Sequence, residues 1–488
     1  MIDNLSNSFF SFSNRDDIIA IFSNNLQLSY KQLFDQSKTI ADFFASKQIN
    51  KNDYVPILIA DQISFIKTIT ALWYLGAIPV PINSRLTNQE IISILEEYDF
   101  KFLITDIDIS FESLSFDGEK LKSTNSHRDT KERIFTKINL AESISFPQNK
   151  IEYPIHDLND EAVVIFTSGS TGKPKGVVHT FSSLINSIEN GNQILNQHEN
   201  DRWLASLPFY HIGGFQIICR SLYNGCAIVI PDSFQTDDLA KTIFEFNPTH
   251  LSLVSTQLEK LIYQKVEPGN QLKVSLIGGG FIDDELMFEA EKLGWKPYRV
   301  YGSSETASFV TAISADEIRQ KPQSVGKSLK NVYTKVAKDS EILIKSESLF
   351  VKYLNDEDES KQKLVDGFYH TGDLGFVDED GYLFIEARRT DLIITGGENV
   401  NPTEVEKAIS KIEGITEVCV FPKPNKTWGH IVACVLVSVD KSLGGKIIKE
   451  MLKKTLAGYK IPKEFIFTDK LPRTSLGKLE REKIRKMF

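Results

Sequence analysis

The chain has 488 residues, of which 41% are hydrophobic and 25% are charged, as in an ordinary enzyme-sized protein. This length predicts at least two domains with large cores. The formal net charge of −9 argues against nucleic acid as a main partner, so a phosphate ligand would have to be met by local positive groups.

The first four-fifths of the chain alternates short apolar runs with helical patterns. Residues 54–83 predict a strand, a helix and a strand, with the sequences YVPILIA, DQISFIKTITALWYLG and AIPVPIN in that order. CAIVIP, HLSLVS, VSLIGGG and YRVYGSSE are further strand candidates between residues 226 and 305. This alternation predicts an α/β fold whose mixed or parallel sheets are covered by helices. Ligands of such folds gather at the carboxyl ends of strands, where we expect the loops Thr167–Gly176, Gly278–Gly280 and Gly302–Thr306.

The pattern changes near residue 340. EILIKSESLFVKY (341–353) and GYLFIEARR (381–389) alternate apolar and polar residues, and DEDG before the second run predicts a hairpin turn. A helix is expected from Pro402 or Thr403, followed by the strands EVCVFP and HIVACVLVSV and a helix at about 446–457. We therefore expect a large N-terminal domain over residues 1–388 and a small, mobile α+β domain over residues 389–488, joined by a hinge.

The cysteines and the N-terminus indicate the compartment. Cys219, Cys226, Cys419 and Cys434 lack CxxC spacing, which favours buried thiols in a reducing cytosol over disulfides or zinc. The N-terminal stretch MIDNLSNSFF lacks the basic region of a signal peptide, and no apolar run reaches membrane-spanning length. We expect a cytoplasmic protein with no membrane span.

The stretch FTSGSTGKPKG, from Phe166 to Gly176, directly follows the apolar run AVVIF. It is not a P-loop, because Lys173 is followed by Pro174 rather than Ser or Thr, and it lacks the Rossmann pattern G-x-G-x-x-G. Its backbone N–H groups, hydroxyls and two lysines could together bind a polyphosphate. A loop of this composition could equally be a solvated turn.

TSGSTGKPKG resembles the signature loop of the acyl-adenylate-forming (AMP-binding) superfamily, which includes acyl-CoA synthetases, luciferases and the adenylation domains of peptide synthetases. Five further blocks follow in the family's order: LPFYHIGG (207–214), YGSSET (301–306), TGD (371–373), RRTDLIITGGENVNPTEVE (388–406) and PRTSLGK (472–478). The resemblance implies an enzyme that uses ATP and Mg²⁺ to convert a carboxylic acid into acyl-AMP and pyrophosphate. Most members then transfer the acyl group to a thiol.

The resemblance also implies an ATP site. The loop that would cradle the β- and γ-phosphates contributes Thr167, Ser168, Gly169, Ser170, Thr171, Gly172, Lys173 and Lys175. Ser304 stands beside the α-phosphate, where the family usually has Thr, and Glu305 would hold Mg²⁺. Asp373 would accept both ribose hydroxyls. Tyr301 and Arg388 complete the nucleotide site, with Ala387 where the family has Gly. Outside their blocks, Glu305 would be read as a solvated acid and Asp373 as a turn residue.

Lys478 matches the C-terminal lysine that bridges the substrate carboxylate and the α-phosphate. For the second step, the family rotates its C-terminal domain about a hinge, whose position here is Thr390 rather than Asp or Lys. After rotation, Gly396, Gly397, Glu398 and Asn399 would line the channel for the pantetheine arm of CoA. We expect free CoA as the acceptor, because ten residues follow Lys478 and none forms a carrier domain.

Fewer residues indicate which carboxylic acid is the substrate. Amino-acid adenylation domains usually have an Asp near the LPFYH block, but this block offers Phe209, Tyr210 and His211, of which His211 is a catalytic candidate. Arg220, inside GFQIICRSLYNG, would either clamp a second carboxylate of the substrate or extend into solvent at a helix edge. The remaining candidates for substrate binding are Gly278, Gly279, Gly280 and Ser308.

Whole phrases look most like the o-succinylbenzoate–CoA ligases of menaquinone biosynthesis, whose substrate is a dicarboxylic acid. The phrases are LPFYHIGGFQIICRSLYNG, YGSSETAS, SVGKSL and RRTDLIITGGENVNPTEVE. One alternative is another aryl- or medium-chain acyl-CoA synthetase. A second is a stand-alone adenylating enzyme that loads a carrier protein. The sequence leaves a homo-oligomer possible.

Overall fold

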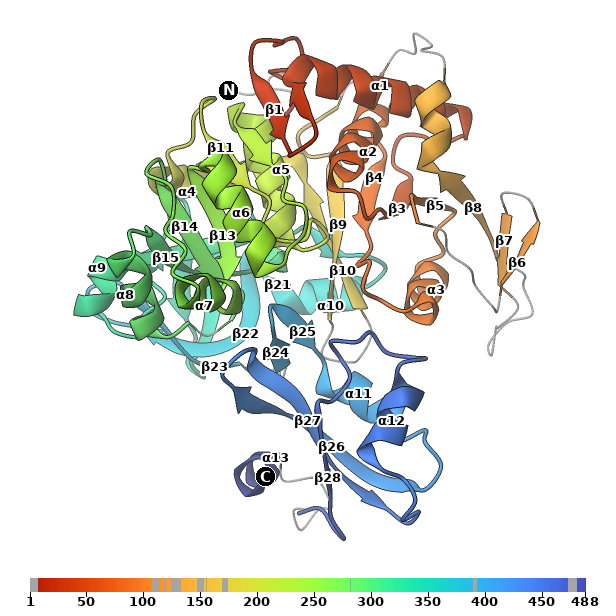
Figure 1. Cartoon of the computed structure of the whole chain (residues 1–488), viewed down its shortest axis with the longest axis vertical. Coiled ribbons are helices and arrows are strands. Elements are labelled where there is room, and N and C mark those ends of the chain that lie inside the picture. Colours follow the sequence, from red (N-terminus) through yellow and green to blue (C-terminus); the bar gives the residue numbers. More distant parts are fainter. Residues whose placement is uncertain are drawn as a thin grey trace.

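The computed structural model describes residues 8–107, 114–117, 120–123, 133–146, 153–154, 156–168, 174–280, 282–388, 393–472 and 481–488. Figure 1 shows a large N-terminal part of sheets and helices and a smaller C-terminal domain below it. This is the α/β architecture predicted from the alternating pattern. Within the described ranges, no helix has the length and apolar character needed to cross a lipid bilayer.

The largest sheet is mixed and has nine strands. In spatial order they are β17 (Lys327–Ser328), β16 (Ser308–Ser314), β15 (Pro297–Ser303), β14 (Val274–Gly278), β13 (His250–Val254), β11 (Arg202–Leu204), β12 (Ala227–Val229), β1 (Ile19–Phe22) and β2 (Gln27–Ser29). The central pairs are parallel, and the pairs at both edges are antiparallel. The four strands predicted between residues 226 and 305 are confirmed as β12, β13, β14 and β15.

Both faces of this sheet are covered, because alternate side chains of its strands enter two different cores. Val274 and Leu276 of β14 join one core, and Ile277 joins the other. The first core includes residues of α1 (Tyr30–Ser46), α2 (Gln62–Leu75), α4 (Phe181–Leu195) and α5 (Ile212–Asn224). The second includes residues of α6 (Thr236–Phe246), α7 (Ser255–Tyr263), α8 (Asp284–Lys292) and α9 (Ala315–Gln320).

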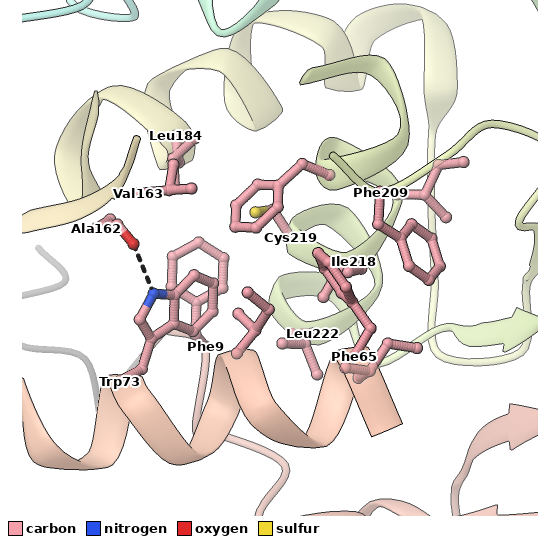
Figure 2. Packing of buried hydrophobic residues seen from close by; sticks show 14 of the residues in the cluster. Phe9, Phe65, Trp73, Ala162, Val163, Leu184, Phe209, Ile218, Cys219 and Leu222 are labelled. Carbon is pink, nitrogen blue, oxygen red and sulfur yellow. Dashed lines mark hydrogen bonds between the residues drawn. The ribbon is translucent and has the colours of Figure 1, made fainter. Parts of the chain in front are cut away.

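Helix α2 shows how the first core holds α5. It starts after Asp61, whose side chain accepts a hydrogen bond from the Ser64 N–H, and it ends at Gly76 with φ +70°. Trp73 Nε1 donates to the carbonyl oxygen of Ala162 at 2.8 Å. In Figure 2, Trp73 lies beside Phe9, and side chains of α5, including Ile218 and Leu222, face the same core. The packing fixes the helix that carries Arg220.

A second sheet has six strands, β4 (Ile78–Pro81), β3 (Tyr54–Leu58), β5 (Phe102–Thr105), β8 (Arg133–Asn139), β7 (Lys120–Ser123) and β6 (Leu114–Asp117). In the chain, α3 (Asn88–Glu97) lies between β4 and β5, and the 3₁₀ helix η2 (Leu140–Ser145) follows β8. Strands β3 and β4 are parallel and α2 connects them, which confirms the strand, helix and strand predicted over residues 54–83.

Two smaller sheets complete the N-terminal part. One contains β20 (Lys352–Tyr353), β10 (Pro174–Thr180) and β9 (Glu161–Ser168). The other contains β18 (Tyr333–Val336), β19 (Glu341–Lys345), β22 (Phe368–Val377), β21 (Leu364–Val365) and β23 (Leu383–Arg388), and α10 (Glu357–Lys363) lies between β20 and β21 in the chain. The predicted DEDG turn is confirmed between β22 and β23, where the Asp378 N–H donates to the Tyr382 carbonyl.

The run at residues 341–353 is not one strand, although its alternation suggested one. Its ends, β19 and β20, belong to different sheets. Between them the hydroxyls of Ser346 and Ser348 lie 2.9 Å apart, and the Ser346 hydroxyl also accepts from the Ser348 N–H. These local hydrogen bonds replace the cross-strand hydrogen bonds of a continuous strand. The alternation of apolar and polar residues does not reveal this interruption.

The C-terminal sheet contains β25 (Glu398–Val400), β24 (Ile393–Thr395), β27 (Gly429–Ser438), β26 (Ile415–Asn425) and β28 (Glu464–Phe467). Its helices are α11 (Pro402–Ile409), α12 (Gly445–Leu452) and α13 (Arg481–Met487). The predicted start at Pro402 is confirmed. The helix predicted over about 446–457 ends earlier, at Leu452. The following turn contains the buried residues Leu456 and Ala457, so the apolar pattern continues beyond the end of the helix.

Candidate active site

The predicted phosphate loop is the tip of a β-hairpin. Strands β9 and β10 pair antiparallel, with Thr167 opposite Lys175 and Ser168 opposite Pro174. The expected loop Thr167–Gly176 was therefore too wide, because the ladder continues through these residues. The five residues of the tip, Gly169, Ser170, Thr171, Gly172 and Lys173, lie outside the described residues.

Lys175 lies in the second residue pair from the tip of this hairpin and has two neighbours that the sequence did not indicate. Its Nζ is 2.6 Å from Oε1 of Glu359 on α10. It also lies 5.5 Å from the ring centroid of Tyr353. The ammonium is thus held by a carboxylate and an aromatic face. An anionic ligand at the tip would compete with Glu359 for it.

Ser304 and Glu305 begin the 3₁₀ helix η3 (Ser304–Thr306), directly after β15. Tyr353 donates its hydroxyl to Oε1 of Glu305 at 3.0 Å, and the Phe350 N–H donates to the Glu305 carbonyl at 2.8 Å. His179 lies 2.7 Å from the Ser304 carbonyl oxygen through Nε2, and burial lowers the pKa of His179 to about 4. A neutral imidazole with a proton on Nε2 therefore donates to that carbonyl and holds the segment in place.

Asp373, in the middle of β22, contacts Tyr301 of β15. The Tyr301 hydroxyl donates to Oδ2 of Asp373 at 2.6 Å, and the Asp373 N–H donates to Thr371 Oγ1 at 3.0 Å. Arg388 is the backbone partner of Asp373 across the β22–β23 ladder. The structure thus brings these three predicted nucleotide residues together, although Tyr301 and Asp373 are 72 residues apart in the chain.

Arg220 lies on α5 and is 1% exposed, so the solvent-exposed alternative is wrong. Its guanidinium lies between the rings of Trp203 and Phe309, 5.2 and 5.3 Å from their centroids, and Nη2 donates to Ser308 Oγ at 2.9 Å. Its Nε has no hydrogen-bond partner in the part of the chain that the structure describes. Burial lowers the pKa of Arg220 to about 10, which still leaves it charged at neutral pH.

A second buried arginine, Arg299, also has an Nε without a partner among the described residues, but it differs from Arg220 in having a counter-charge. Arg299 forms an ion pair with Asp284 and donates to the carbonyls of Ser324 and Ile282 at 2.9 and 3.0 Å. Among the described residues, Arg220 has no carboxylate partner. A buried cation without a counter-charge is rare and indicates a place for an anionic ligand.

The glycine-rich turn of the C-terminal domain packs onto the glycines that follow β14. A Cβ on Gly280 would lie 3.3 Å from Cγ2 of Ile394, and one on Gly397 would lie 3.0 Å from Cγ1 of Val254. Gly279 and Gly397 both have φ +85°, in the left-handed region that favours glycine. Gly278 ends β14 and approaches Val300. These glycines therefore allow the two domains to pack closely against each other.

Glu398, directly after these glycines, is 4% exposed and reaches into the N-terminal part. Its Oε2 is 3.0 Å from Nε2 of His211, the residue before α5, and its Oε1 accepts from Arg85 Nη1 at 2.9 Å. Burial would raise the pKa of Glu398, but the three basic groups His211, Arg85 and Lys460 outweigh it and the pKa is lowered. Asn399, by contrast, is exposed.

A buried lysine also joins the domains. Lys460 Nζ lies 2.8 Å from Glu404 of α11 and 2.9 Å from Glu90 of α3. Burial alone would lower the pKa of Lys460, but the two carboxylates raise it. Nearby, the Asn83 side-chain amide donates to the Tyr459 hydroxyl at 3.3 Å. These contacts hold the C-terminal domain in one orientation.

Trp428, Lys260 and Lys463 form a cationic and aromatic surface beside the glycine turn. Trp428 is 39% exposed, and its carbonyl accepts from the Gly396 N–H at 3.2 Å. Lys463 and Lys260 place their Nζ atoms 3.6 and 5.1 Å from its ring centroid. Burial and the positive charges of Lys449 and Lys260 lower the pKa of Lys463. No sequence pattern indicated this surface, because its residues come from separate segments of both domains.

Lys478 and Thr390 lie outside the described residues. Leu471 and Ile484, which lie before and after residues 473–480, pack in one apolar cluster with Cys419 and Phe421 of β26. Figure 1 shows α13, which carries Ile484, at the end of the C-terminal domain away from the N-terminal part. In this orientation the glycine turn faces the N-terminal part, and α13 does not.

Comparison with known proteins gives consistent matches. Residues 11–354 match the model of the AMP-binding enzyme family, and residues 404–478 match that of the AMP-binding enzyme C-terminal domain. A 2-succinylbenzoate–CoA ligase from Listeria monocytogenes is 32% identical over 465 residues, which cover 94% of each chain.

Two solved structures of o-succinylbenzoate CoA synthetase from Bacillus subtilis resemble the chain to different degrees. A double mutant bound to a product analogue has a TM-score of 0.89 at 28% identity over 98% of each chain. The complex with the acyl-adenylate intermediate has a TM-score of 0.73 at 29% identity over the same share.

Proposed function

Because the chain belongs to the AMP-binding enzyme family, we propose that it is an ATP-dependent acid–CoA ligase acting on o-succinylbenzoate. In the first step the acid attacks the α-phosphate of ATP, forming acyl-AMP and releasing pyrophosphate. In the second step the thiol of CoA attacks the acyl carbonyl and AMP leaves. The observation that carries the proposal is the similarity to 2-succinylbenzoate–CoA ligases over 94% of the chain.

The first step needs positive charge and geometry rather than an acid–base pair. Thr167, Ser168, Lys175 and the hairpin tip would bind the β- and γ-phosphates, and Ser304 would face the α-phosphate. Asp373 and Arg388, with Tyr301 beside them, would bind the ribose. These roles rest on the matched blocks and on the meeting of Tyr301 and Asp373.

Glu305 fits the requirements of Mg²⁺. Its carboxylate is a hard oxygen ligand next to the phosphate hairpin, and Tyr353 holds one of its oxygens. Within the described part of the chain, no three His, Cys, Asp or Glu side chains gather into a metal site of their own. Mg²⁺ commonly binds through one or two carboxylates plus substrate phosphates, and it would offset their negative charge.

The buried Arg220 supports an acid with a second carboxylate. The ring carboxylate of o-succinylbenzoate can accept from Nε, which lacks a partner, and from Nη2, which already contacts Ser308. Two parallel N–H bonds of this kind suit a planar guanidinium. The acid would enter from the end of α5 where His211 lies.

The domain arrangement supports the second step. The chain superposes better on the product-analogue complex than on the acyl-adenylate complex of the same Bacillus enzyme. In this arrangement Gly396, Gly397 and Glu398 lie against the N-terminal part, where they would line the entry for pantetheine. Trp428 would stack against the adenine of CoA, and Lys260 and Lys463 would meet its phosphates.

The Glu90→Gln variant should slow transfer to CoA about 10-fold and leave adenylation within about twofold, because it removes one charge that holds the domains in this orientation. Glutamine keeps the helix cap, in which Oε2 of Glu90 now accepts from the Thr87 N–H at 2.8 Å. Single-turnover measurement of each half-reaction checks this. Equal losses in both steps would contradict an orientation-specific role.

The proposed activity is tested with a panel of carboxylic acids, ATP, Mg²⁺ and CoA, read by pyrophosphate release and thioester formation. We expect o-succinylbenzoate to give the highest kcat/KM. A higher value for a simple aryl or medium-chain acid would assign a different acyl-CoA synthetase. Acyl transfer to a carrier protein without use of CoA would assign the stand-alone adenylating enzyme.

We also propose that the domain boundary lies between residues 388 and 389. Strand β23 ends at Arg388 in one sheet, and β24 begins at Ile393 in another. The hinge at Thr390 and the cytoplasmic location remain predictions from the sequence.

A further inference from the structure

Helix α5 carries two buried polar side chains, four residues apart, that lack partners for some of their polar atoms. Gln216 is 0% exposed, and among the described residues neither its Nε2 nor its Oε1 has a hydrogen-bond partner. Arg220 has the unpartnered Nε described above. Residues four apart lie on the same face of a helix, so the two side chains form one row.

The row runs from the domain interface into the protein. Its deep end is Arg220, between Trp203 of β11 and Phe309 of β16. The other end of α5 follows His211, which contacts Glu398 of the C-terminal domain. Gln216 therefore lies about 6 Å along the helix from Arg220, on the side of the interface.

Buried side-chain amides are almost always hydrogen-bonded in native structures. Gln197, another buried glutamine, follows this rule: its Nε2 donates to Cys226 Sγ and its Oε1 accepts from the Asn224 side chain. Gln216 makes no such bond. An unpartnered amide beside an unpartnered guanidinium nitrogen points to a polar ligand that meets both.

We propose that Gln216 is a specificity-determining residue that donates its side-chain N–H to the keto oxygen of o-succinylbenzoate. The proposal rests on the proposed function. In this acid, the keto carbon is attached to the ring carbon next to the one that carries the carboxylate, and two methylene groups separate it from the carboxylate that is activated. The keto oxygen thus lies between the two carboxylates, as Gln216 lies between Arg220 and the interface.

The test pairs Gln216→Met with an analogue, 4-(2-carboxyphenyl)butanoate, in which a methylene replaces the keto group. Wild type should prefer the keto acid by about 10- to 100-fold in kcat/KM, because the analogue leaves the amide unpaired. Gln216→Met should lose most of this preference, by reduced activity on the keto acid and unchanged or increased activity on the analogue. Methionine keeps the length of the side chain without its polar atoms.

Thermal unfolding of the free protein gives a second readout. Gln216→Met should keep or raise the Tm, because it removes a buried amide that has no partner. The matched control Gln197→Met should lower the Tm and leave the preference for the keto acid unchanged.

Two results would overturn the proposal: an unchanged preference in Gln216→Met, or equal losses on both acids. Failure of the wild type on both acids would instead contradict the proposed function itself, and the role of Gln216 would fall with it.

Discussion

The Lys478→Ala variant is expected to lose adenylation by at least about 100-fold and to keep thioester formation from supplied acyl-adenylate. Only the first step brings two anions together, the substrate carboxylate and the α-phosphate. A compact ammonium between them cancels their repulsion, and alanine cannot. The second step joins a thiol to an activated acyl group and needs no such bridge. Pyrophosphate release and single-turnover thioester formation measure the two steps separately.

The structure supports this separation through the domain orientation. The flanks of Lys478, Leu471 and Ile484, pack in the C-terminal domain with β26, whereas Glu398 is the residue that contacts His211. We therefore predict that the C-terminal domain turns before adenylation and that Lys478 is dispensable for the transfer to CoA. Equal losses in both half-reactions would mean that Lys478 is structural or wrongly assigned.

Local patterns sufficed to predict much of the fold. Helix α2 is capped by Asp61 and Gly76, residue types that are common at helix ends, and the β22–β23 turn has the turn-forming sequence DEDG. Even the partners Tyr301 and Asp373, 72 residues apart, could be placed in one nucleotide site by their blocks. These features depend on residue types in short windows, which a single sequence contains.

The contacts that the sequence did not reveal join distant segments. Glu359 binds Lys175 from 184 residues away, and Glu90 binds Lys460 from 370 residues away. Each is an ordinary charged residue on a helix, and nothing in its neighbours distinguishes it from a solvated one. The sequence likewise could not show whether Arg220 extends into solvent. Its burial between two aromatic rings excludes that alternative.

Arg220→Gln should lower kcat/KM for o-succinylbenzoate by about 30-fold to several thousand-fold, because the loss of one partner of a buried charge pair costs about 2–5 kcal/mol. Removal of the guanidinium would leave the ring carboxylate desolvated and unpaired. An analogue without the ring carboxylate should be a poor substrate of the wild type and should respond little to the substitution. Steady-state kinetics of both proteins with both acids measures this difference.

The matched control is Arg299→Gln, since Arg299 is also buried but already has Asp284 and two carbonyls as partners. It should lower the Tm and affect both acids equally. Arg220→Gln should instead distinguish the acids, and its Tm should change little or rise, because Arg220 has no carboxylate partner among the described residues. If both acids lose equally in Arg220→Gln, the arginine serves packing between Trp203 and Phe309. The dicarboxylate substrate would then rest on similarity to the known ligases alone.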